Sequence, residues 1–546
     1  MSFADAIKAG SAKHPAPDAL AGKFQYGTAG FRMKADSLDA VVYRVGLLAS
    51  LRSRFKNGRT IGVMITASHN PPQDNGVKLV DPFGDMLESS WEQYATQLAN
   101  AITDEELATE YEKIATEYKI KLSTPAKVVF ARDTRASGSR LVECLVDALK
   151  ATDVGYTDFK LATTPQLHYY TRCINTKGTQ DSYGEPTEQG YYEKLGAAFK
   201  QVMESAKPSG SVIVDCANGV GGPKLRELIK HLPEGILDIK VVNDDVHKPD
   251  SLNYQCGADY VKTTQSAPPS SKAAPNTRCC SLDGDADRIV YYYVDNDRVF
   301  HLLDGDRIAT LAATFIGDLA RKAGLADQIK IGVVQTAYAN GASTSFVQKN
   351  LQLPVECTPT GVKHLHHAAL RFDVGVYFEA NGHGTVLFSE NAQKVIHTYE
   401  PASPAEADAL ATLIGLTDLI NQTVGDALSD MLLVEAVLAH KNWSCTEWFH
   451  TYKDLPNRLA RVEVEDRNAF KTVPGTAERK LASPAGAQQA IDALVVKYSD
   501  ARSFVRASGT EDAVRVYAEA RTTAESQDLC RAVEQVVRRY GGSNGQ

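Results

Sequence analysis

The sequence predicts an α/β protein with three related domains of mixed or parallel sheets, followed by a C-terminal α+β domain with an antiparallel sheet. Along most of the chain, short apolar runs alternate with segments whose apolar residues recur at helical spacing, which is typical of βα units. The last part instead contains runs that alternate between apolar and polar residues, which favours an antiparallel sheet with helices on one face. At 546 residues the chain exceeds the usual size of one domain, about 100–200 residues.

The first predicted domain covers residues 1–180. Ile61-Gly62-Val63-Met64-Ile65 is a short buried strand, preceded by a helix whose apolar stripe consists of Val41, Val45, Leu48, Leu51 and Phe55. A charged helical segment over 90–118 follows it, and a second strand at 127–131 leads into ARDTR (131–135). The polar, glycine-containing stretch 174–190 is interpreted as the linker to the next domain.

The second predicted domain covers residues 181–300, and its expected elements are strands at 211–215 and 289–293 and a helix at 224–229. The glycine turn after the first of these strands lacks the GxGxxG spacing, so we expect an ordinary strand–helix turn there. The third predicted domain covers 301–450, with a helix from Ile308 to Leu319 and strands at 329–334, 374–378 and 385–388. The last two of these strands form a hairpin, and helices then run to about residue 450.

The fourth predicted domain covers residues 451–546. Its strands are expected at 461–464 and 514–520, and its helices at 486–497 and 526–539.

Composition excludes several classes of function. The net charge is −8 and no basic tract dominates, so we expect no nucleic-acid partner. No run approaches the about 20 apolar residues of a membrane span, and the N-terminus lacks the apolar core of a signal peptide. Nine scattered cysteines without a metal-binding spacing suggest reduced thiols. We therefore expect a cytoplasmic protein with no membrane association and no obligate protein partner.

The strand at 61–65 ends in Thr66-Ala67-Ser68-His69-Asn70-Pro71-Pro72, which presents a hydroxyl at a loop tip. Open α/β sheets place reacting groups at the carboxyl ends of their strands, so Ser68 is the candidate nucleophile. His69 lies beside it, and Lys78 is a second possible proton carrier. A turn in which Ser, Asn and Pro only shape the backbone explains the same residues.

Asp283, Asp285 and Asp287 alternate along an expected loop, so their carboxylates can converge on one cation. Such close carboxylates repel one another unless a cation neutralises them, and oxygen ligands favour Mg²⁺, Mn²⁺ or Ca²⁺. A calcium-binding loop is excluded by its spacing, since it requires a glycine at position six and a glutamate at position twelve. A solvated acidic turn remains the alternative.

Two further loops carry groups that can bind a ligand. Arg506-Ala507-Ser508-Gly509-Thr510-Glu511, together with Arg515, has the donors of a phosphate clamp, although a capped turn explains the same hydroxyls. Glu379-Ala380-Asn381-Gly382-His383-Gly384 puts an acid, an amide and an imidazole on a hairpin tip, where they can bind sugar hydroxyls or simply form a polar turn.

Together, a serine, a divalent-cation loop, a polyol-binding tip and a phosphate clamp describe the relocation of a phosphate on a sugar. A metal-dependent phosphatase shares the aspartates and the phosphate binding, but it does not explain four separate loops. A non-catalytic sugar-phosphate-binding protein does not require the serine and the aspartates, and both are intact here.

TASHNP (66–71), DGDADR (283–288), EANGHG (379–384) and RASGTE (506–511) resemble the serine, metal, sugar and phosphate loops of the α-D-phosphohexomutase family, in the same order. The resemblance covers nearly the whole chain and implies a four-domain fold. In most of that family the Arg-Asp strand motif precedes the serine loop, whereas here ARDTR follows it. This order, with FEANGHG (378–384) and NYQCGAD (253–259), is similar to the eukaryotic branch that acts on N-acetylglucosamine phosphates.

The resemblance implies an isomerase that interconverts N-acetylglucosamine 6-phosphate and 1-phosphate and feeds UDP-N-acetylglucosamine synthesis. Phosphoglucomutase or phosphomannomutase activity within the same family is the alternative. The implied enzyme carries phosphorylated Ser68, primed by a sugar 1,6-bisphosphate, and passes through a bisphosphate intermediate.

The resemblance also assigns roles to individual residues. It implies one Mg²⁺ per chain, on Asp283, Asp285, Asp287 and a Ser68 phosphate oxygen. Lys78 is the implied proton carrier, and Arg288, His69 and Arg32 stabilise the phosphoryl group. The implied substrate-binding residues are Glu379, Asn381, His383, Arg506, Ser508, Gly509, Thr510 and Arg515.

Overall fold

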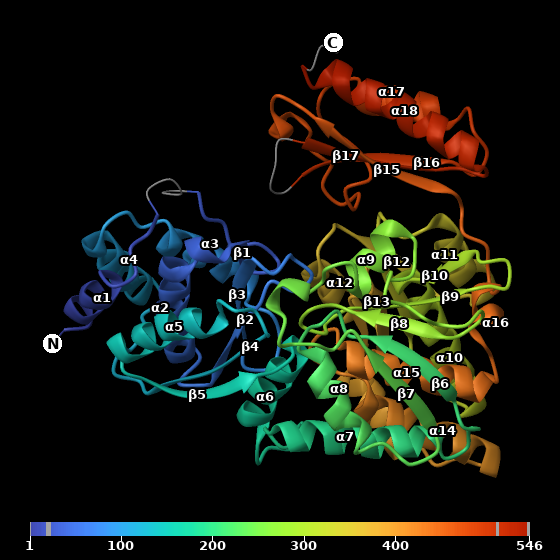
Figure 1. Ribbon diagram of the computed structural model, residues 1–546, viewed down its shortest axis with the longest axis horizontal. Coiled ribbons are helices and arrows are strands. Elements are labelled where there is room, and N and C mark those ends of the chain that lie inside the picture. The colour runs from blue at the N-terminus through green and yellow to red at the C-terminus, as the bar shows by residue number, and fades with distance from the viewer. Residues whose placement is uncertain (1, 18–22, 509–512, 543–546) are drawn as a thin grey trace. The chain divides into compact units, whose positions relative to one another are not determined.

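The computed structural model describes residues 2–17, 23–508 and 513–542. Contacts divide the chain into two compact units. The first unit consists of Met1–Asp304, Asn381–Thr385 and Ala411–Cys445, and the second of Gly305–Ala380, Val386–Leu410 and Thr446–Gln546. Four sheets confirm the predicted fold class, and most of their strands are labelled in Figure 1. The four domain boundaries drawn from the sequence remain predictions. In the described part of the chain, no helix is long and apolar enough to cross a membrane.

The first sheet has the strand order β1-β3-β2-β4-β5, in which β2, β4 and β5 are parallel while β3 pairs antiparallel with both β1 and β2. Its strands are β1 (Phe31–Lys34), β2 (Ile61–Ile65), β3 (Asp74–Val80), β4 (Ala126–Arg132) and β5 (Val154–Leu161). Its helices are α1 (Phe3–Ser11), α2 (Asp39–Phe55), α3 (Ser89–Ala99), α4 (Asp104–Glu117), α5 (Gly138–Ala151) and α6 (Thr164–Thr176).

The alternation of side chains along β2 separates the two faces of this sheet. Ile61, Val63 and Ile65 belong to the core that α2 to α5 also line. Gly62 lies on the other face, where an added Cβ would come within 2.6 Å of the Thr171 hydroxyl on α6. The lack of a side chain at Gly62 therefore lets α6 approach the sheet beside the carboxyl end of β2.

The structure adds two points to the expectations for this region. The charged segment 90–118 is two helices, because Thr103 accepts a hydrogen bond from the Glu106 N–H and caps the start of α4. Residues 74–80 form β3, a strand that the sequence analysis did not identify, and this strand carries Lys78.

The second sheet has the order β10-β9-β8-β6-β7, with β6 parallel to both β7 and β8. Its strands are β6 (Gly210–Asp215), β7 (Leu237–Val242), β8 (Cys279–Leu282), β9 (Ile289–Val294) and β10 (Phe300–Leu303). The helices of this stretch are α7 (Glu188–Met203), α8 (Gly221–Ile229) and α9 (Gly257–Thr264). Strands β8 and β9 are adjacent and antiparallel, so the aspartate-rich segment 283–288 is the turn that joins them.

The third sheet has the order β12-β11-β13-β14, and β11 is parallel to β12 and β13. Its strands are β11 (Ile331–Thr336), β12 (Val355–Thr358), β13 (Val374–Phe378) and β14 (Gly384–Phe388). The helices of this stretch are α10 (Gly305–Lys322), α11 (Gly341–Ser345), α12 (Val362–Ala369), α13 (Glu390–Thr398), α14 (Pro404–Leu419), α15 (Ala427–Lys441) and α16 (Cys445–Phe449).

The C-terminal sheet is antiparallel, with the order β15-β17-β16. Its strands are β15 (Asn457–Glu463), β16 (Arg502–Ala507) and β17 (Ala513–Glu519), and its helices are α17 (Ala487–Val495) and α18 (Thr523–Tyr540). Figure 1 shows both helices on one face of this sheet, as the sequence predicted. Strand β16 was not predicted: Arg506 lies near the end of a strand and not in a loop.

Candidate active site

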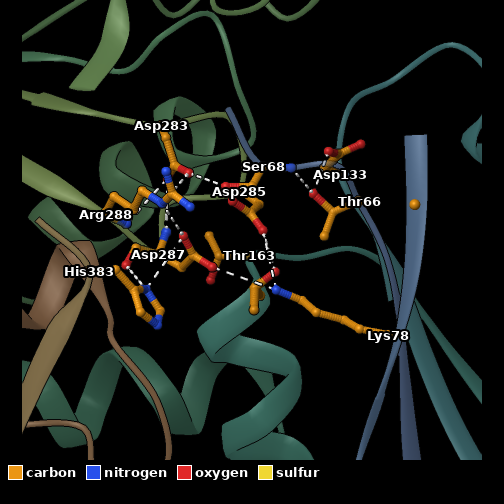
Figure 2. A network of polar contacts seen from close by, with 12 residues as sticks. Thr66, Ser68, Lys78, Asp133, Thr163, Asp283, Asp285, Asp287, Arg288 and His383 are labelled. Carbon is orange, nitrogen blue, oxygen red and sulfur yellow. Dashed lines mark hydrogen bonds and ion pairs between the residues drawn. The ribbon is translucent and has the colours of Figure 1, made fainter. Parts of the chain in front are cut away.

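Ser68 lies just beyond the carboxyl end of β2, in the turn that leads to β3, and it is fully buried. Its backbone is left-handed, with φ of 51°, a conformation that non-glycine residues seldom adopt. The Thr66 hydroxyl accepts a hydrogen bond from the Ser68 N–H (3.0 Å) and donates one to Asp133 (2.7 Å). Figure 2 shows this chain of contacts from Asp133 to Ser68. The serine is therefore held in one strained orientation.

Arg135 is the main support of the serine loop. Its guanidinium is buried and donates to four backbone carbonyls of that loop, those of Ser68 (2.9 Å), Asn70 (2.8 Å), Pro71 (2.6 Å) and Asp74 (2.9 Å). Asp133 pairs with the Nε of Arg135 at 3.0 Å. A second support is Asn253, whose side-chain amide donates to the carbonyls of Ser68 and Asn70.

Arg135 and Asn253 were not among the predicted site residues, although they lie in ARDTR (131–135) and NYQCGAD (253–259). An arginine just after a buried strand was the available signal for Arg135. The carbonyls that it binds belong to the serine loop, more than 60 positions away in the sequence, so no local pattern indicated this pairing.

The three aspartates of the β8–β9 turn converge beside this serine. Asp283, Asp285 and Asp287 are all buried, and one oxygen of each lies within 4.8 Å of the others. The Ser68 hydroxyl donates to the Asp283 Oδ2 at 2.5 Å, although the two residues are 215 positions apart in sequence. The fold thus brings together the predicted nucleophile and the predicted metal ligands (Figure 2).

Three helix N-termini hold the backbone of the aspartate turn. The N–H of Val220 at the start of α8 donates to the Gly284 carbonyl at 3.1 Å, and Thr164 at the start of α6 donates to the Asp285 carbonyl at 3.2 Å. At the start of α15, the Ala427 N–H donates to the Ala286 carbonyl at 3.0 Å. Helix N-termini carry partial positive charge, so they stabilise this concentration of carboxylates.

The aspartates also suit a cation chemically. The Oδ1 atoms of Asp285 and Asp287 are buried, and neither accepts a hydrogen bond from any residue that the structure describes. Burial and the two neighbouring aspartates raise the pKa of Asp283 well above its usual value, since three adjacent charges repel one another. Three oxygen donors with two unsatisfied atoms fit a hard divalent cation such as Mg²⁺.

Two side-chain cations border the aspartates. Lys78 Nζ on β3 lies 3.8 Å from the Asp285 Oδ2 and 3.5 Å from the Asp287 Oδ2. The Arg288 Nε lies 3.9 Å from Asp283 and 3.8 Å from Asp287. Burial opposes the charge of Asp287, but His383, Lys78 and Arg288 outweigh it and hold the pKa of Asp287 well below its usual range.

Arg32 on β1 belongs to the same electrostatic cluster. Burial and the nearby Arg288 lower the pKa of Arg32, and the three aspartates oppose that shift. The Nε of Arg32 is buried and donates no hydrogen bond within the described part of the chain. Arg32 is therefore a buried donor beside the aspartates, as an anion-binding role requires.

The two predicted histidines differ in their surroundings. His69 Nδ1 lies 3.5 Å from the Ser68 hydroxyl, and burial with the adjacent Arg288 and Arg32 lowers the pKa of His69 to about 2. His69 is thus a neutral imidazole at physiological pH. His383 Nδ1 lies 2.7 Å from the Asp287 carbonyl, which can only accept, so Nδ1 carries the proton.

The hairpin tip between β13 and β14 reaches the aspartate turn through Gly382. This glycine has φ of +90°, and an added Cβ would overlap the Ile289 carbonyl at the start of β9. The Gly382 carbonyl in turn accepts from the Ile289 N–H at 3.2 Å. Asn381 Oδ1 accepts from the His383 N–H at 2.9 Å and closes the turn. Glu379 follows β13 and belongs to the second unit.

The predicted phosphate clamp lies in the second unit. Arg506 on β16 and Arg515 on β17 are directly opposite each other in the antiparallel ladder. Like charges in such a pair repel, so an anion between them is favoured. Arg506 Nε lies 3.0 Å from Glu478, and the Ser508 N–H donates to the Ala513 carbonyl at 2.8 Å. Gly509 and Thr510 lie outside the described residues.

Family models match all four parts of the chain. Those described as phosphoacetylglucosamine mutase AMG1, domain II and domain III, match residues 181–290 and 304–443. Those described as phosphoglucomutase/phosphomannomutase alpha/beta/alpha domain I and C-terminal domain match 51–106 with 97–180, and 459–536.

Curated relatives match along the whole chain. The phosphoacetylglucosamine mutase of Candida albicans is 50% identical, over 98% of this chain and 100% of its own length. The Homo sapiens phosphoacetylglucosamine mutase is 48% identical, over 99% of this chain and 98% of its own length.

Solved structures that match this chain are described as the same kind of enzyme. The Aspergillus fumigatus N-acetylphosphoglucosamine mutase in complex with GlcNAc-6P and magnesium is 64% identical, with a TM-score of 0.95 over 99% of both chains. An N-acetylglucosamine-phosphate mutase in its product complex, described as a member of the alpha-D-phosphohexomutase superfamily, is 50% identical. It has a TM-score of 0.93 over 98% of this chain and 100% of that one. The chain therefore belongs to the phosphoacetylglucosamine mutases of the α-D-phosphohexomutase superfamily.

Proposed function

We propose that the chain is an isomerase that interconverts N-acetylglucosamine 6-phosphate and N-acetylglucosamine 1-phosphate, through phosphorylated Ser68 and a sugar 1,6-bisphosphate. The observation that carries the proposal is the 2.5 Å hydrogen bond from Ser68 to Asp283 inside a buried three-carboxylate cluster. Two solved structures of one relative, the Aspergillus fumigatus enzyme, support it: one is described in complex with GlcNAc-6P and magnesium, and the other is a variant in complex with glucose 1,6-bisphosphate.

In the first half-reaction, the bond between Ser68 Oγ and phosphorus breaks while a sugar hydroxyl forms a new bond to that phosphorus. Lys78, beside Asp285 and Asp287, takes the hydroxyl proton in its neutral amine form, and Ser68 Oγ departs as an alkoxide that attacks again in the second half-reaction. The bisphosphate then reverses its orientation without leaving the site. In the second half-reaction its other phosphate is transferred to Ser68, and Lys78 returns the proton to the sugar oxygen. A sugar 1,6-bisphosphate also primes the unphosphorylated enzyme.

Positioning and electrostatics dominate phosphoryl transfer, and the site is built for both. Asp283, Asp285 and Asp287 would hold one Mg²⁺ together with an oxygen of phosphorylated Ser68. That ion would neutralise charge on the transferring group. Arg288 and Arg32 offset further negative charge, and neutral His69 contributes a hydrogen bond to the phosphoserine.

Two further sets of residues are assigned to the substrate. Glu379, Asn381 and His383 bind sugar hydroxyls in either orientation, or in the case of His383 the acetamido group. Arg506, Ser508 and Arg515, with Gly509 and Thr510, bind the phosphate that does not react. The complete burial of Ser68 favours transfer to a sugar over transfer to water.

We place the enzyme in the cytoplasm, where its product supplies UDP-N-acetylglucosamine synthesis, and we infer no obligate protein partner. All nine cysteines are free thiols, and eight of them are buried, which suits a reducing compartment.

The test is to follow purified protein by ³¹P NMR with the 6-phosphates of N-acetylglucosamine, glucose and mannose, each with Mg²⁺ and a trace of sugar 1,6-bisphosphate. We expect conversion to the 1-phosphate, fastest for N-acetylglucosamine, without accumulation of inorganic phosphate. Stoichiometric release of inorganic phosphate would identify a phosphatase instead. Faster conversion of glucose or mannose 6-phosphate would favour a hexose phosphomutase.

A further inference from the structure

Thr164, at the start of α6, makes two contacts with one aspartate of the cluster. Its hydroxyl donates to the Asp285 Oδ2 at 2.6 Å, and its backbone N–H donates to the Asp285 carbonyl at 3.2 Å. The side chain is completely buried. Thr164 and Asp285 are 121 positions apart, so this contact exists only in the folded chain.

Because of this hydroxyl, the two carboxylate oxygens of Asp285 differ in their hydrogen bonds. Oδ2 accepts from Thr164 and lies 3.8 Å from the ammonium of Lys78. Oδ1 is buried and accepts no hydrogen bond from the residues that the structure describes. A carboxylate pinned through one oxygen cannot rotate freely, so its other oxygen keeps one direction.

We propose that Thr164 is a positioning residue. It holds Asp285 so that Oδ1 faces the cation, while Oδ2 stays bound to the Thr164 hydroxyl. This inference rests on the metal site of the proposed function. Without the hydroxyl, Asp285 is free to turn either oxygen toward Lys78, and that ion pair competes directly with the cation. Residues that orient metal ligands commonly change metal affinity by about 10- to 100-fold.

The start of α6 is built to keep Thr164 in place. Thr163 caps the helix: its hydroxyl accepts from the Gln166 N–H at 3.1 Å, and Gln166 returns a bond to the Thr163 N–H at 3.0 Å. Pro165 at the first turn supplies no competing donor. Thr163 thus stabilises the helix end, whereas Thr164 contacts the aspartate. Substitutions at these two adjacent positions therefore distinguish an effect on the helix from an effect on Asp285.

The experiment measures Mg²⁺ and Mn²⁺ binding to the full-length protein without substrate, by calorimetry and by Mn²⁺ electron paramagnetic resonance. Thr164→Val removes the hydroxyl at nearly constant volume, and we expect the dissociation constant to rise about 10- to 100-fold. Thr164→Ser keeps the hydroxyl, and we expect a dissociation constant within about threefold of wild type. Thr164→Ala replaces the valine variant if that protein does not fold.

Thr163→Ala is the matched control, since it weakens the helix cap and leaves the Asp285 contact intact. We expect it to lower thermal stability with little change in metal affinity. Metal affinity in Thr164→Val equal to wild type would overturn the proposal, as would an equal loss in Thr163→Ala or Thr164→Ser. If the wild type binds no cation, as expected of Asp285→Asn, that result contradicts the metal site of the proposed function and not the contact between Thr164 and Asp285.

Discussion

The aspartate turn of the first unit and the arginine pair of the second both place like charges side by side, but they differ in burial and in their surroundings. Asp283, Asp285 and Asp287 are at most 5% exposed, and helix N-termini surround them. Arg506 is 25% exposed, and its neighbour across the strands, Arg515, has the same charge. The fold itself holds the buried cluster in place, whereas Arg506 is partly exposed to solvent.

This difference separates two tasks in one enzyme. A buried, pre-oriented cluster stabilises charge that changes during the reaction, because the surrounding dipoles need no rearrangement. A partly exposed arginine pair, in which Arg506 has Glu478 beside it, would suit the binding and release of an anion of constant charge. Variants of the two regions should therefore affect different kinetic constants.

The largest effect is expected from Ser68→Ala. Without the hydroxyl there is no acceptor for the phosphoryl group, so kcat should fall on the order of 10⁴-fold or more, while the fold is kept. Phosphate incorporation measured by mass spectrometry should disappear with it. Ser68→Gly is a useful companion, since glycine relieves the left-handed backbone but should restore no activity. Near-normal turnover in either variant would contradict the assignment of the nucleophile.

An intermediate effect is expected from Arg506→Lys, which keeps the charge and loses the bidentate fork. We expect KM to rise about tenfold for both N-acetylglucosamine 6-phosphate and the 1-phosphate, with kcat and Ser68 phosphorylation nearly unchanged.

Arg502→Lys on the same strand is the control for the Arg506 variant. Arg502 is committed to Glu519 and to the carbonyls of Ala337 and Ala339, so its loss should lower stability and leave KM unchanged. A KM change in one direction of the reaction alone would argue against a shared clamp. An unchanged KM in Arg506→Lys would remove that residue from the site.

The smallest effect is expected from Asp430→Asn, and it concerns stability. Asp430 lies on α15, fully buried, and neither of its oxygens has a hydrogen-bond partner among the residues described. Burial and the nearby Asp426 raise the pKa of Asp430 well above its usual value. The folded state therefore retains a proton that the unfolded chain loses above about pH 4, and Asp430 lowers stability progressively as pH rises from there to its folded pKa.

Asp430→Asn should therefore raise the Tm by several degrees at pH 7.5, and the gain should shrink toward pH 4. Activity should be unchanged. Asp426→Asn is the contrasting variant, since Asp426 caps α15 and accepts from Tyr191 and Asn421, so its loss should lower the Tm. A lower Tm for Asp430→Asn at pH 7.5 would show that the two buried carboxylates do not differ in this way.

Local patterns predicted much of the fold. The apolar run 61–65 is β2 and the run 374–378 is β13, with the predicted bounds, because a short apolar run between turn residues has few other stable conformations. Strands β3 and β16 were missed because polar residues interrupt them: Asp74, Asn75 and Lys78 in one, Arg502, Ser503 and Arg506 in the other. Their pairing with neighbouring strands, rather than their own composition, makes them strands.

Local sequence patterns were enough to predict the reactive groups: a serine after a buried strand, three alternating aspartates, a glycine-containing hairpin tip and an arginine-rich segment. Each of these signals lies within a few consecutive residues, where side-chain type and spacing carry the information. The long-range contacts follow from the fold instead: Ser68 meets Asp283, three helix N-termini hold the aspartate turn, and Arg135 and Thr164 support the two loops. These contacts join segments 60 to more than 200 positions apart. No local pattern specifies their partners, because packing of the whole domain sets which strand ends and helix ends meet.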